Sequence, residues 1–221
     1  MIGVVVDIDD TLIDTRRRMQ GILQEVLGRE VPQQDVEALA PREVFEKYAT
    51  PKQRTHADEL ARRFQDLLLC RDEEGVELMR LDEPVPFAAE ALRAWSGSCV
   101  LVYLTGRLED IREQTLRELE GFGFPTENVE LVMFDPRDWG PGPRLLEARN
   151  RLLSSIAERH DVVRAVDDYP GYFVAYRDLG IPDRVGLHRS RRYTRRDFIN
   201  RGATRVLESW EPLVDDLPGR I

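Results

Sequence analysis

The sequence lacks long apolar runs and is poor in cysteine and in lysine. No apolar run approaches the roughly 18 residues that a membrane-spanning helix needs, and no secretory signal is evident, so we expect a cytoplasmic protein with no membrane partner. The two cysteines, Cys70 and Cys99, lie in apolar runs, which is typical of buried free thiols in a reducing compartment. Because Lys47 and Lys52 are the only lysines, a fixed cation elsewhere in the chain must be an arginine.

Basic side chains are outnumbered by acidic ones. The 221 residues carry 32 lysines and arginines against 41 aspartates and glutamates, which gives a net charge of −9. This balance argues against a general nucleic-acid or acidic-membrane binder. One basic run, residues 188–196, is rich in arginine and departs from the acidic composition of the chain. We interpret this run as a solvated surface, with contact to an anionic substrate or a polynucleotide as the alternative.

Short apolar runs alternate with helical periodicity over much of the chain. Residues 2–6 form an apolar, β-branched run typical of a strand buried on both faces, which favours a parallel sheet. Further strands are expected over residues 99–104, 129–134, 162–166 and 184–187. Apolar residues at helical spacing separate them, and a last helix is expected through Val206, Leu207 and Trp210. This alternation predicts an α/β fold, with a Rossmann-like parallel sheet and helices on both of its faces.

One long segment, residues 15–81, shows helical spacing and no convincing strand. A proline-rich joint, residues 82–86, follows it, and the alternation of strands and helices begins only after this joint. We therefore predict a small all-α domain over residues 15–81, inserted after the first strand. The α/β core is then made of residues 1–14 and 82–221.

Polar side chains follow the predicted strands where those strands end. Those of interest are Asp7, Asp9, Asp10, Thr105, Asp167 and Asp168, with Trp139 in the loop after a fourth strand. In an open parallel sheet, ligands bind beyond the carboxyl ends of the strands. Carboxylates gathered there repel one another unless a cation lies among them, and Mg²⁺ is the natural choice because it prefers oxygen ligands and shares phosphate oxygens. The Thr105 hydroxyl and the Gly106 amide can both donate to such a phosphate.

Each cluster taken alone has a simpler interpretation. Asp9, Asp10 and Thr11 are also typical of a helix cap, and Thr105-Gly106-Arg107 of an ordinary turn. A calcium loop beginning at Asp7 is excluded, because its sixth and twelfth positions hold leucine and arginine in place of glycine and glutamate. The joint occurrence at three strand ends favours a site for a cation and a phosphate.

These motifs resemble those of the haloacid dehalogenase (HAD) superfamily of phosphotransferases. Asp7-Ile8-Asp9-Asp10-Thr11 is similar to its first motif, Thr105 to its second, and Asp167-Asp168 to its acidic fourth motif. The insertion lies where the family carries a helical type 1 cap. The resemblance covers the whole chain except this insertion, and it indicates a chemistry without naming a substrate.

The third motif is where the sequence departs from the family. The usual lysine is absent before the fourth motif. Arg149, on the preceding helix and 18 residues before Asp167, is our choice for the replacement cation, and Arg144 at the start of that helix is the rival. For either arginine, a solvated helix face is the alternative interpretation.

The resemblance implies roles for the matching residues. Asp7 is the nucleophile that forms an aspartyl-phosphate, and Asp9 is the proton shuttle. Mg²⁺ is held by Asp7, by the backbone carbonyl of Asp9 and by Asp167, with Asp168 nearby. The transferring phosphate is held by Thr105, Gly106, Arg149 and Arg107.

The implied activity is that of a phosphatase acting on a small phosphorylated substrate, with the cap closing over the site and choosing that substrate. A polynucleotide-end phosphatase or a phosphomutase would keep the same residues. The missing lysine motivates a further alternative, a regulatory phosphate-binding protein that has lost turnover. The sequence leaves the oligomeric state and the specificity residues of the cap open.

Overall fold

The computed structural model describes residues 1–138 and 143–219, so the expectation for Trp139 lies outside the described residues. The described chain divides into two compact units. One contains Met1–Ile13, Pro84–Arg189 and the residues from Tyr193 on, and the other contains Asp14–Glu83 with Ser190–Arg192. The boundaries expected from the sequence lie one or two residues from these, without the segment at 190–192. The division into a core and an inserted domain stays a prediction.

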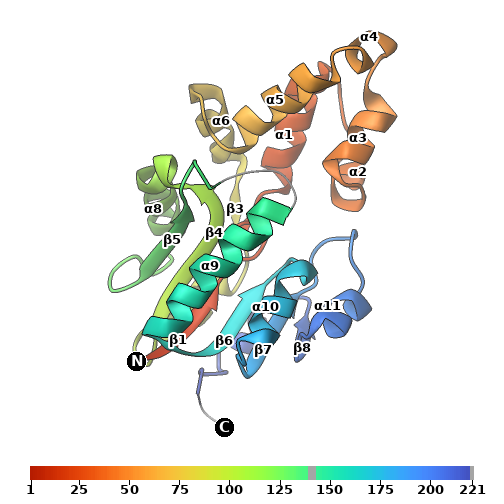
Figure 1. The fold of residues 1–221 in the computed structure, drawn as a ribbon. Coiled ribbons are helices and arrows are strands. Elements are labelled where there is room, and N and C mark those ends of the chain that lie inside the picture. Colours follow the sequence, from red (N-terminus) through yellow and green to blue (C-terminus); the bar gives the residue numbers. More distant parts are fainter. Residues whose placement is uncertain (139–142, 220–221) are drawn as a thin grey trace. The chain divides into compact units, whose positions relative to one another are not determined.

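The first unit is built on a six-stranded sheet in the order β5-β4-β1-β6-β7-β8, in which each neighbouring pair is parallel (Figure 1). The strands are β1 (Ile2–Val6), β4 (Val100–Leu108), β5 (Glu130–Phe134), β6 (Asp161–Asp167), β7 (Asp183–Leu187) and β8 (Arg205–Leu207). The predicted parallel α/β sheet is confirmed. Because β1 and β6 are neighbours in the middle of the sheet, their carboxyl ends bring Asp7 and Asp167 to one edge.

Helices cover the sheet on both faces. Helices α9 (Pro143–Arg159), α10 (Phe173–Asp178) and α11 (Arg195–Arg201) share a buried apolar cluster with alternate residues of the central strands, and Figure 1 shows α9 and α10 in front of the sheet. On the opposite side of β6, the Arg164 guanidinium lies 4.9 Å from the ring centroid of Trp95 in α7 (Ala88–Ser96). Helix α8 (Arg112–Gly121) connects β4 to β5.

The predicted final helix is wrong. Val206 and Leu207 lie in β8, which pairs with β7, and the helix of this region is α11, which begins at Arg195 near the end of the basic run. Three apolar residues are too few to distinguish the two-residue period of a strand from the 3.6-residue period of a helix. The structure also provides hydrogen-bond partners for this backbone at the edge of β7, and these partners cannot be read from the sequence. Strand β4 also runs four residues beyond Leu104, the predicted end, so Thr105 lies within it.

The second unit is helical. Its helices are α1 (Arg16–Leu27), α2 (Gln33–Ala38), α3 (Pro41–Tyr48), α4 (Pro51–Arg54), α5 (Ala57–Leu68) and α6 (Glu73–Leu78). Helix α1 ends at Gly28, whose φ of 61° is a left-handed conformation that glycine adopts without a Cβ clash. Two-residue strands, β2 (Ile13–Asp14) and β3 (Glu83–Pro84), pair with each other where the chain leaves and re-enters the first unit.

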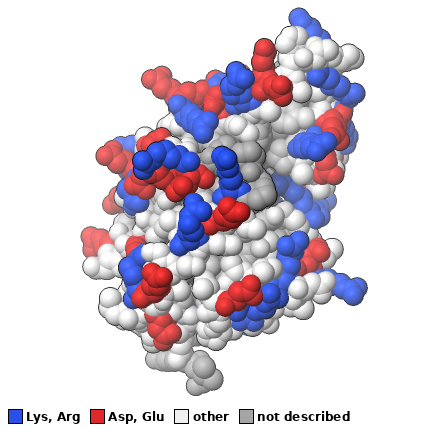
Figure 2. Space-filling model, in the orientation of Figure 1, with Lys and Arg blue, Asp and Glu red and all other residues white. Residues whose placement is uncertain are grey.

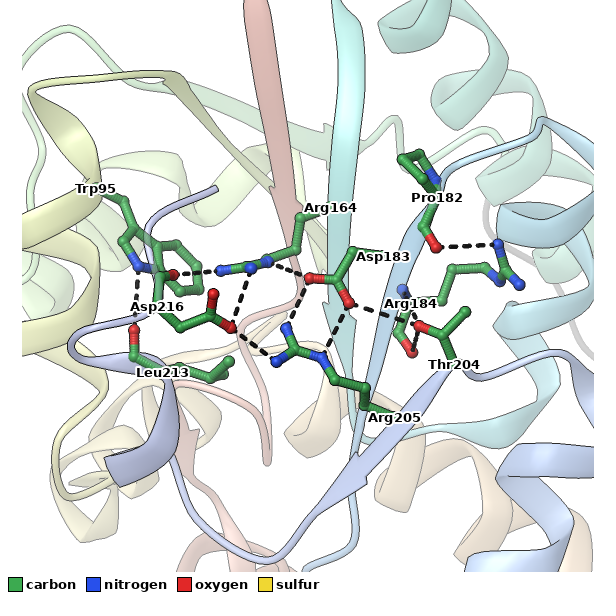
Figure 3. Close-up of polar contacts among 9 residues, drawn as sticks. All are labelled: Trp95, Arg164, Pro182, Asp183, Arg184, Thr204, Arg205, Leu213 and Asp216. Atoms are coloured by element: carbon green, nitrogen blue, oxygen red, sulfur yellow. Dashed lines mark hydrogen bonds and ion pairs between the residues drawn. The ribbon is translucent and has the colours of Figure 1, made fainter. Parts of the chain in front are cut away.

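A charged network fastens the C-terminal segment to the sheet of the first unit (Figure 3). Arg164 of β6 donates from Nε to Asp183 (2.6 Å) and from Nη1 to the carbonyl of Asp216 (2.7 Å). Arg205 of β8 donates to the same two aspartates, to Asp183 at 2.6 Å and to Asp216 at 2.7 Å. Trp95 adds a hydrogen bond from its indole to the carbonyl of Leu213 (3.1 Å). The sheet edge and residues 213–216 are therefore held by hydrogen bonds and ion pairs as well as by apolar packing.

Acidic and basic side chains are intermixed on the face of the molecule in Figure 2, without a broad region of one sign. The basic run does not act as one surface. Arg189 belongs to the first unit, whereas Arg192 donates to the carbonyl of Val36 (2.8 Å) within the helical unit. Within the described residues, no helix has both the length and the apolar character needed to cross a membrane.

Candidate active site

The site begins where β1 ends. The amide of Asp7 still donates to Val166 of β6 (3.0 Å), so the residue is held in register at the sheet edge. The chain then turns tightly, with the Ile8 carbonyl accepting from the amide of Leu12 (2.8 Å) and Asp10 in a left-handed conformation at a φ of 58°. Helix α1 starts only at Arg16, after Thr15 as its N-cap, so the acidic cluster does not cap it. The local geometry instead aims the Asp7 carboxylate, which is buried, at the sheet edge.

Three carboxylates converge at this edge. One oxygen from each of Asp7, Asp167 and Asp168 lies within 4.8 Å of the others. Such a donor set, made only of hard carboxylate oxygens, fits a cation such as Mg²⁺. The side chain of Asp9 is not a member of this group. The expectation that Asp9 contributes its backbone carbonyl to the metal stays a prediction.

The electrostatics of the group follow from its burial. Burial and the charge of Asp167 raise the pKa of Asp7 well above its usual range, and Arg149 opposes them only in part. Burial and the charges of Asp10 and Asp167 likewise raise the pKa of Asp168. Close like charges at low solvent exposure cannot all ionise at no cost. A bound cation would offset the repulsion between these carboxylates. Their arrangement is therefore more favourable with a metal bound than without one.

Arg149 is the cation that enters the site. Its side chain is 2% exposed, and its Nη2 donates to Asp167 (2.6 Å) while its Nη1 forms an ion pair with Asp7 (3.3 Å). Nη1 also donates to the carbonyl of Leu104 in β4 (3.0 Å). Arg144, the rival from the sequence, is exposed. Of the two, only Arg149 bridges the expected nucleophile and the expected metal ligand.

Two tyrosines at this site were not singled out from the sequence as site residues. The Tyr176 hydroxyl donates to Asp167 (2.7 Å) and accepts from Arg149 (3.0 Å), and the ring centroid of Tyr172 lies 3.9 Å from the Arg149 guanidinium carbon. Both belong to an apolar stripe that predicts only a helix. The only feature of the sequence that could have indicated a role at the site is their i, i+4 spacing, which begins four residues after Asp168.

Asp9 lies with the second-motif residues. The Arg107 guanidinium donates to Asp9 (2.9 Å) and forms an ion pair with Glu118 of α8 (2.5 Å). The Thr105 hydroxyl lies 3.5 Å from the Asp9 carboxylate. Gly106 is exposed, and a Cβ built on it would have no neighbour within 4 Å, so its backbone is open to a ligand. Arg107 thus faces Asp9 and Glu118, and its expected role in binding phosphate stays a prediction.

The loop that carries Asp9 and Asp10 is contacted by three other segments of the first unit. Trp210 donates from its indole to the carbonyl of Thr11 (2.8 Å), and the Thr11 hydroxyl lies 3.5 Å from Asp168. Arg189, the first arginine of the basic run, donates to the carbonyl of Asp10 (3.4 Å). One member of that run therefore borders the acidic site, a position that the sequence does not display.

The helical unit contains a polar cavity of its own, with a volume of about 640 Å³. Its lining includes Gln20 and Gln24, which both donate to the carbonyl of Val31, and Arg16, which is paired with Asp14. Amide, guanidinium and carboxylate groups around one cavity suit a small polar ligand better than an apolar one.

No protein-family model matches the sequence, and no curated protein is similar enough to be matched. Solved structures do match. A Clostridium difficile protein provisionally named a phosphatase has a TM-score of 0.71 at 16% identity over 97% of both chains. A HAD-superfamily hydrolase of subfamily IA from Geobacter sulfurreducens has a TM-score of 0.64 at 18% identity, over 97% of this chain and 95% of that one. A HAD family hydrolase from Deinococcus radiodurans, solved with bound phosphate and sodium, has a TM-score of 0.59 at 17% identity, over 96% and 92%.

These likenesses extend over nearly the whole chain at low identity, and they show its fold. The chain has the fold of the haloacid dehalogenase-like hydrolases, with a Rossmann-like parallel sheet and a helical insertion after β1. The fold class that the sequence motifs predicted is therefore confirmed.

Proposed function

We propose that the chain is a magnesium-dependent phosphatase that hydrolyses a small phosphate monoester through an aspartyl-phosphate on Asp7. One observation carries the proposal. Asp7, Asp167 and Asp168 converge at the carboxyl edge of the sheet, and Arg149 bridges the first two of them. Such an edge is where open α/β sheets bind ligands, and a nucleophile, a metal-ligand set and a fixed cation are the parts that phosphoryl transfer needs.

In the first step, a carboxylate oxygen of Asp7 attacks phosphorus in line. A bond forms between this oxygen and phosphorus, the bond to the ester oxygen breaks, and Asp9 donates a proton to that oxygen as the alcohol leaves. Asp9 enters this step as the acid and leaves it as the carboxylate, which Arg107 then stabilises beside the Thr105 hydroxyl.

In the second step, water attacks the phosphorus of the aspartyl-phosphate. Asp9 takes a proton from this water, the Asp7–phosphorus bond breaks, and inorganic phosphate leaves with Asp7 restored. Asp7, Asp167 and Asp168 would hold Mg²⁺, which supplies neutralisation of the phosphate charge. The open amide of Gly106 offers a donor to the transferring group, and Arg149 places its positive charge beside Asp7. Direct contact of Arg149 with the phosphate stays a prediction.

The first prediction concerns the nucleophile. Wild-type protein is expected to release phosphate from p-nitrophenyl phosphate in the presence of Mg²⁺, and Asp7→Asn to abolish this release because an amide cannot form the covalent intermediate. The measurement is phosphate release over time, with Asp161→Asn, a change of an exposed aspartate at the opposite end of β6 from the site, as the matched control. Equal turnover by wild type and Asp7→Asn would rule the mechanism out.

The substrate class is tested by a panel. Small phosphorylated metabolites are expected to be hydrolysed faster than a 5′- or 3′-phosphorylated oligonucleotide. Preference for the oligonucleotide would favour a polynucleotide-end phosphatase, and isomerisation of a sugar phosphate without phosphate release would favour a phosphomutase. No turnover of any compound would favour a regulatory protein.

A further inference from the structure

Arg149, at the centre of the site, is held by contacts at both of its terminal nitrogens. Its terminal nitrogens make hydrogen bonds to Leu104, Asp167 and Tyr176 and an ion pair with Asp7. The remaining N–H, on Nε, is buried and has no hydrogen-bond partner among the described residues. The orientation of the guanidinium plane therefore depends on these contacts and on what packs against its flat face.

Tyr172 supplies that packing. Its ring centroid lies 3.9 Å from the guanidinium carbon, which is the distance of a cation stacked on an aromatic face. The ring is itself held edge-on by Tyr169, with centroids 4.8 Å apart. A planar cation needs a flat wall to stay in one plane, and a stacked ring provides it.

Tyr176 supplies a hydroxyl between the cation and a carboxylate. It is completely buried in α10, it donates to the same Asp167 oxygen that Arg149 contacts, and it accepts from Arg149. The three groups form a closed triangle with sides of 2.6, 2.7 and 3.0 Å. Asp167 also accepts from the backbone amide of Tyr169 (2.9 Å) through its other oxygen. The triangle therefore fixes one oxygen of this carboxylate, and the amide fixes the other.

We propose that Tyr176 and Tyr172 are positioning residues of the active site. Tyr176 orients Asp167 for the metal and Arg149 for Asp7, and Tyr172 holds the guanidinium in the plane that serves both aspartates. This pair adapts the site to an arginine, in a chain whose only lysines are Lys47 and Lys52 of the helical unit. The proposal rests on the proposed phosphatase function for its kinetic consequences, and on Asp167 as a ligand for its metal-binding consequences.

The test compares Tyr176→Phe with Tyr103→Phe. Both variants keep a buried ring and lose one hydroxyl, but the Tyr103 hydroxyl donates to the carbonyl of Pro125 (2.8 Å) and touches none of the site carboxylates. Mg²⁺ binding to the metal-free protein is measured by isothermal titration calorimetry, and kcat and KM are measured on p-nitrophenyl phosphate. Urea unfolding of both variants shows whether the two losses of stability are comparable.

Tyr176→Phe is expected to weaken Mg²⁺ binding and to lower kcat by about 10- to 100-fold each, with KM changed by less than about threefold, because partners of metal ligands typically have effects of this size. Tyr103→Phe is expected to stay near wild type in Mg²⁺ binding. Equal Mg²⁺ affinities for the two variants would overturn the role of Tyr176, whatever the kinetics show.

Tyr172 is tested by the same measurements on two substitutions. Tyr172→Phe keeps the ring face and is expected to retain a kcat at least about fivefold above that of Tyr172→Leu, which removes it. Equal kcat values would overturn the role of the ring. If wild type itself shows no turnover, the proposed function fails, and the calorimetric comparison at Tyr176 still decides whether this tyrosine positions Asp167.

Discussion

Arg149 has two tasks that a lysine could not perform in the same way. Its fork reaches Asp7 with one terminal nitrogen and Asp167 with the other, and it retains donors for Leu104 and Tyr176. An ammonium is a compact point charge on a flexible stem, and it has no planar face to stack on Tyr172. That Arg149 takes the part of the lysine expected in the third motif stays a prediction, and these contacts are what support it.

Replacing this cation is expected to affect both stability and turnover. Arg149→Met leaves two buried carboxylates without their partner, and removal of one member of a buried pair typically costs about 3–5 kcal/mol. Arg149→Lys keeps the charge but not the fork, so we expect a smaller loss of stability and a fall in kcat of about tenfold or more. The measurements are urea unfolding without metal and kcat with Mg²⁺.

Arg144→Lys is the matched control, because Arg144 lies on the same helix and is exposed. We expect a change of unfolding free energy within about 0.5 kcal/mol for it. If Arg149→Lys behaved like Arg144→Lys in both measurements, the bridging role of Arg149 would be lost.

At the scale of the elements, the interactions that stabilise the strands differ between the centre and one edge of the sheet. All of these strands are held by backbone pairing and apolar burial, and the edge formed by β7 and β8 is additionally tied to β6 and to Asp216 by the charged network of Figure 3. In that network Asp216 of the C-terminal segment pairs with Arg205 and Arg164. The ion pairs of Arg205 with Asp183 and Asp216 therefore add to the backbone pairing of β8 with β7.

The contribution of Asp216 is expected to depend on pH. Burial raises the pKa of its carboxyl, but the hydrogen bond from Arg205 and the charge of Arg164 outweigh this, and the net pKa is lowered. A lowered pKa means that the carboxylate stabilises the folded state above the unfolded pKa of about 3.9, and that this contribution is lost as the pH falls through the folded-state pKa.

Asp216→Asn is therefore expected to cost about 1 kcal/mol at pH 7, and the difference from wild type should shrink as the pH is lowered from 5 towards 3. The measurement is the urea midpoint of both proteins across this range. Asp215→Asn changes the exposed neighbour and should show no such trend. A difference that stayed constant with pH would contradict the electrostatic origin.

At the scale of the whole molecule, the cluster of Asp7, Asp167 and Asp168 is expected to couple folding to metal binding. Three carboxylates gathered at 4.8 Å or less are costly to ionise together, and the pKa of Asp7 and of Asp168 is raised as a result. A cation that binds only the folded chain adds its binding free energy to stability. The fold therefore carries a local destabilisation that the expected cofactor would relieve.

Mg²⁺ is accordingly expected to raise the midpoint of thermal unfolding. At a concentration of about 100 times the dissociation constant the gain is about 2.7 kcal/mol, which corresponds to roughly 5–10 °C for a chain of this size. Asp167→Asn should abolish most of this shift, whereas Asp161→Asn, an exposed aspartate at the other end of β6, should keep it. The comparison is made by calorimetry at one pH and ionic strength.

The sequence by itself determined the sheet and the place of the site. Buried runs of strand length, alternating with helical stripes, define a parallel sheet, and in such a sheet carboxyl ends meet at one edge, so Asp7 and Asp167 had to come together. The edge strand β8 was missed because three residues are too few to show a periodicity. Its backbone pairs with the edge of β7, and that edge becomes available only once the sheet has formed.

Only the tertiary structure decided which side chains complete the site. Arg144 and Arg149 lie five residues apart, and at about 100° per residue they point to faces of α9 roughly 140° apart, so the choice depended on how that helix packs on the sheet. The triangle of Tyr176, Arg149 and Asp167 joins two helices and a strand. The pairing of Arg107 with both Asp9 and Glu118 likewise joins a strand to a loop and a helix. Such contacts depend on distances between elements, and no local pattern of residues encodes those distances.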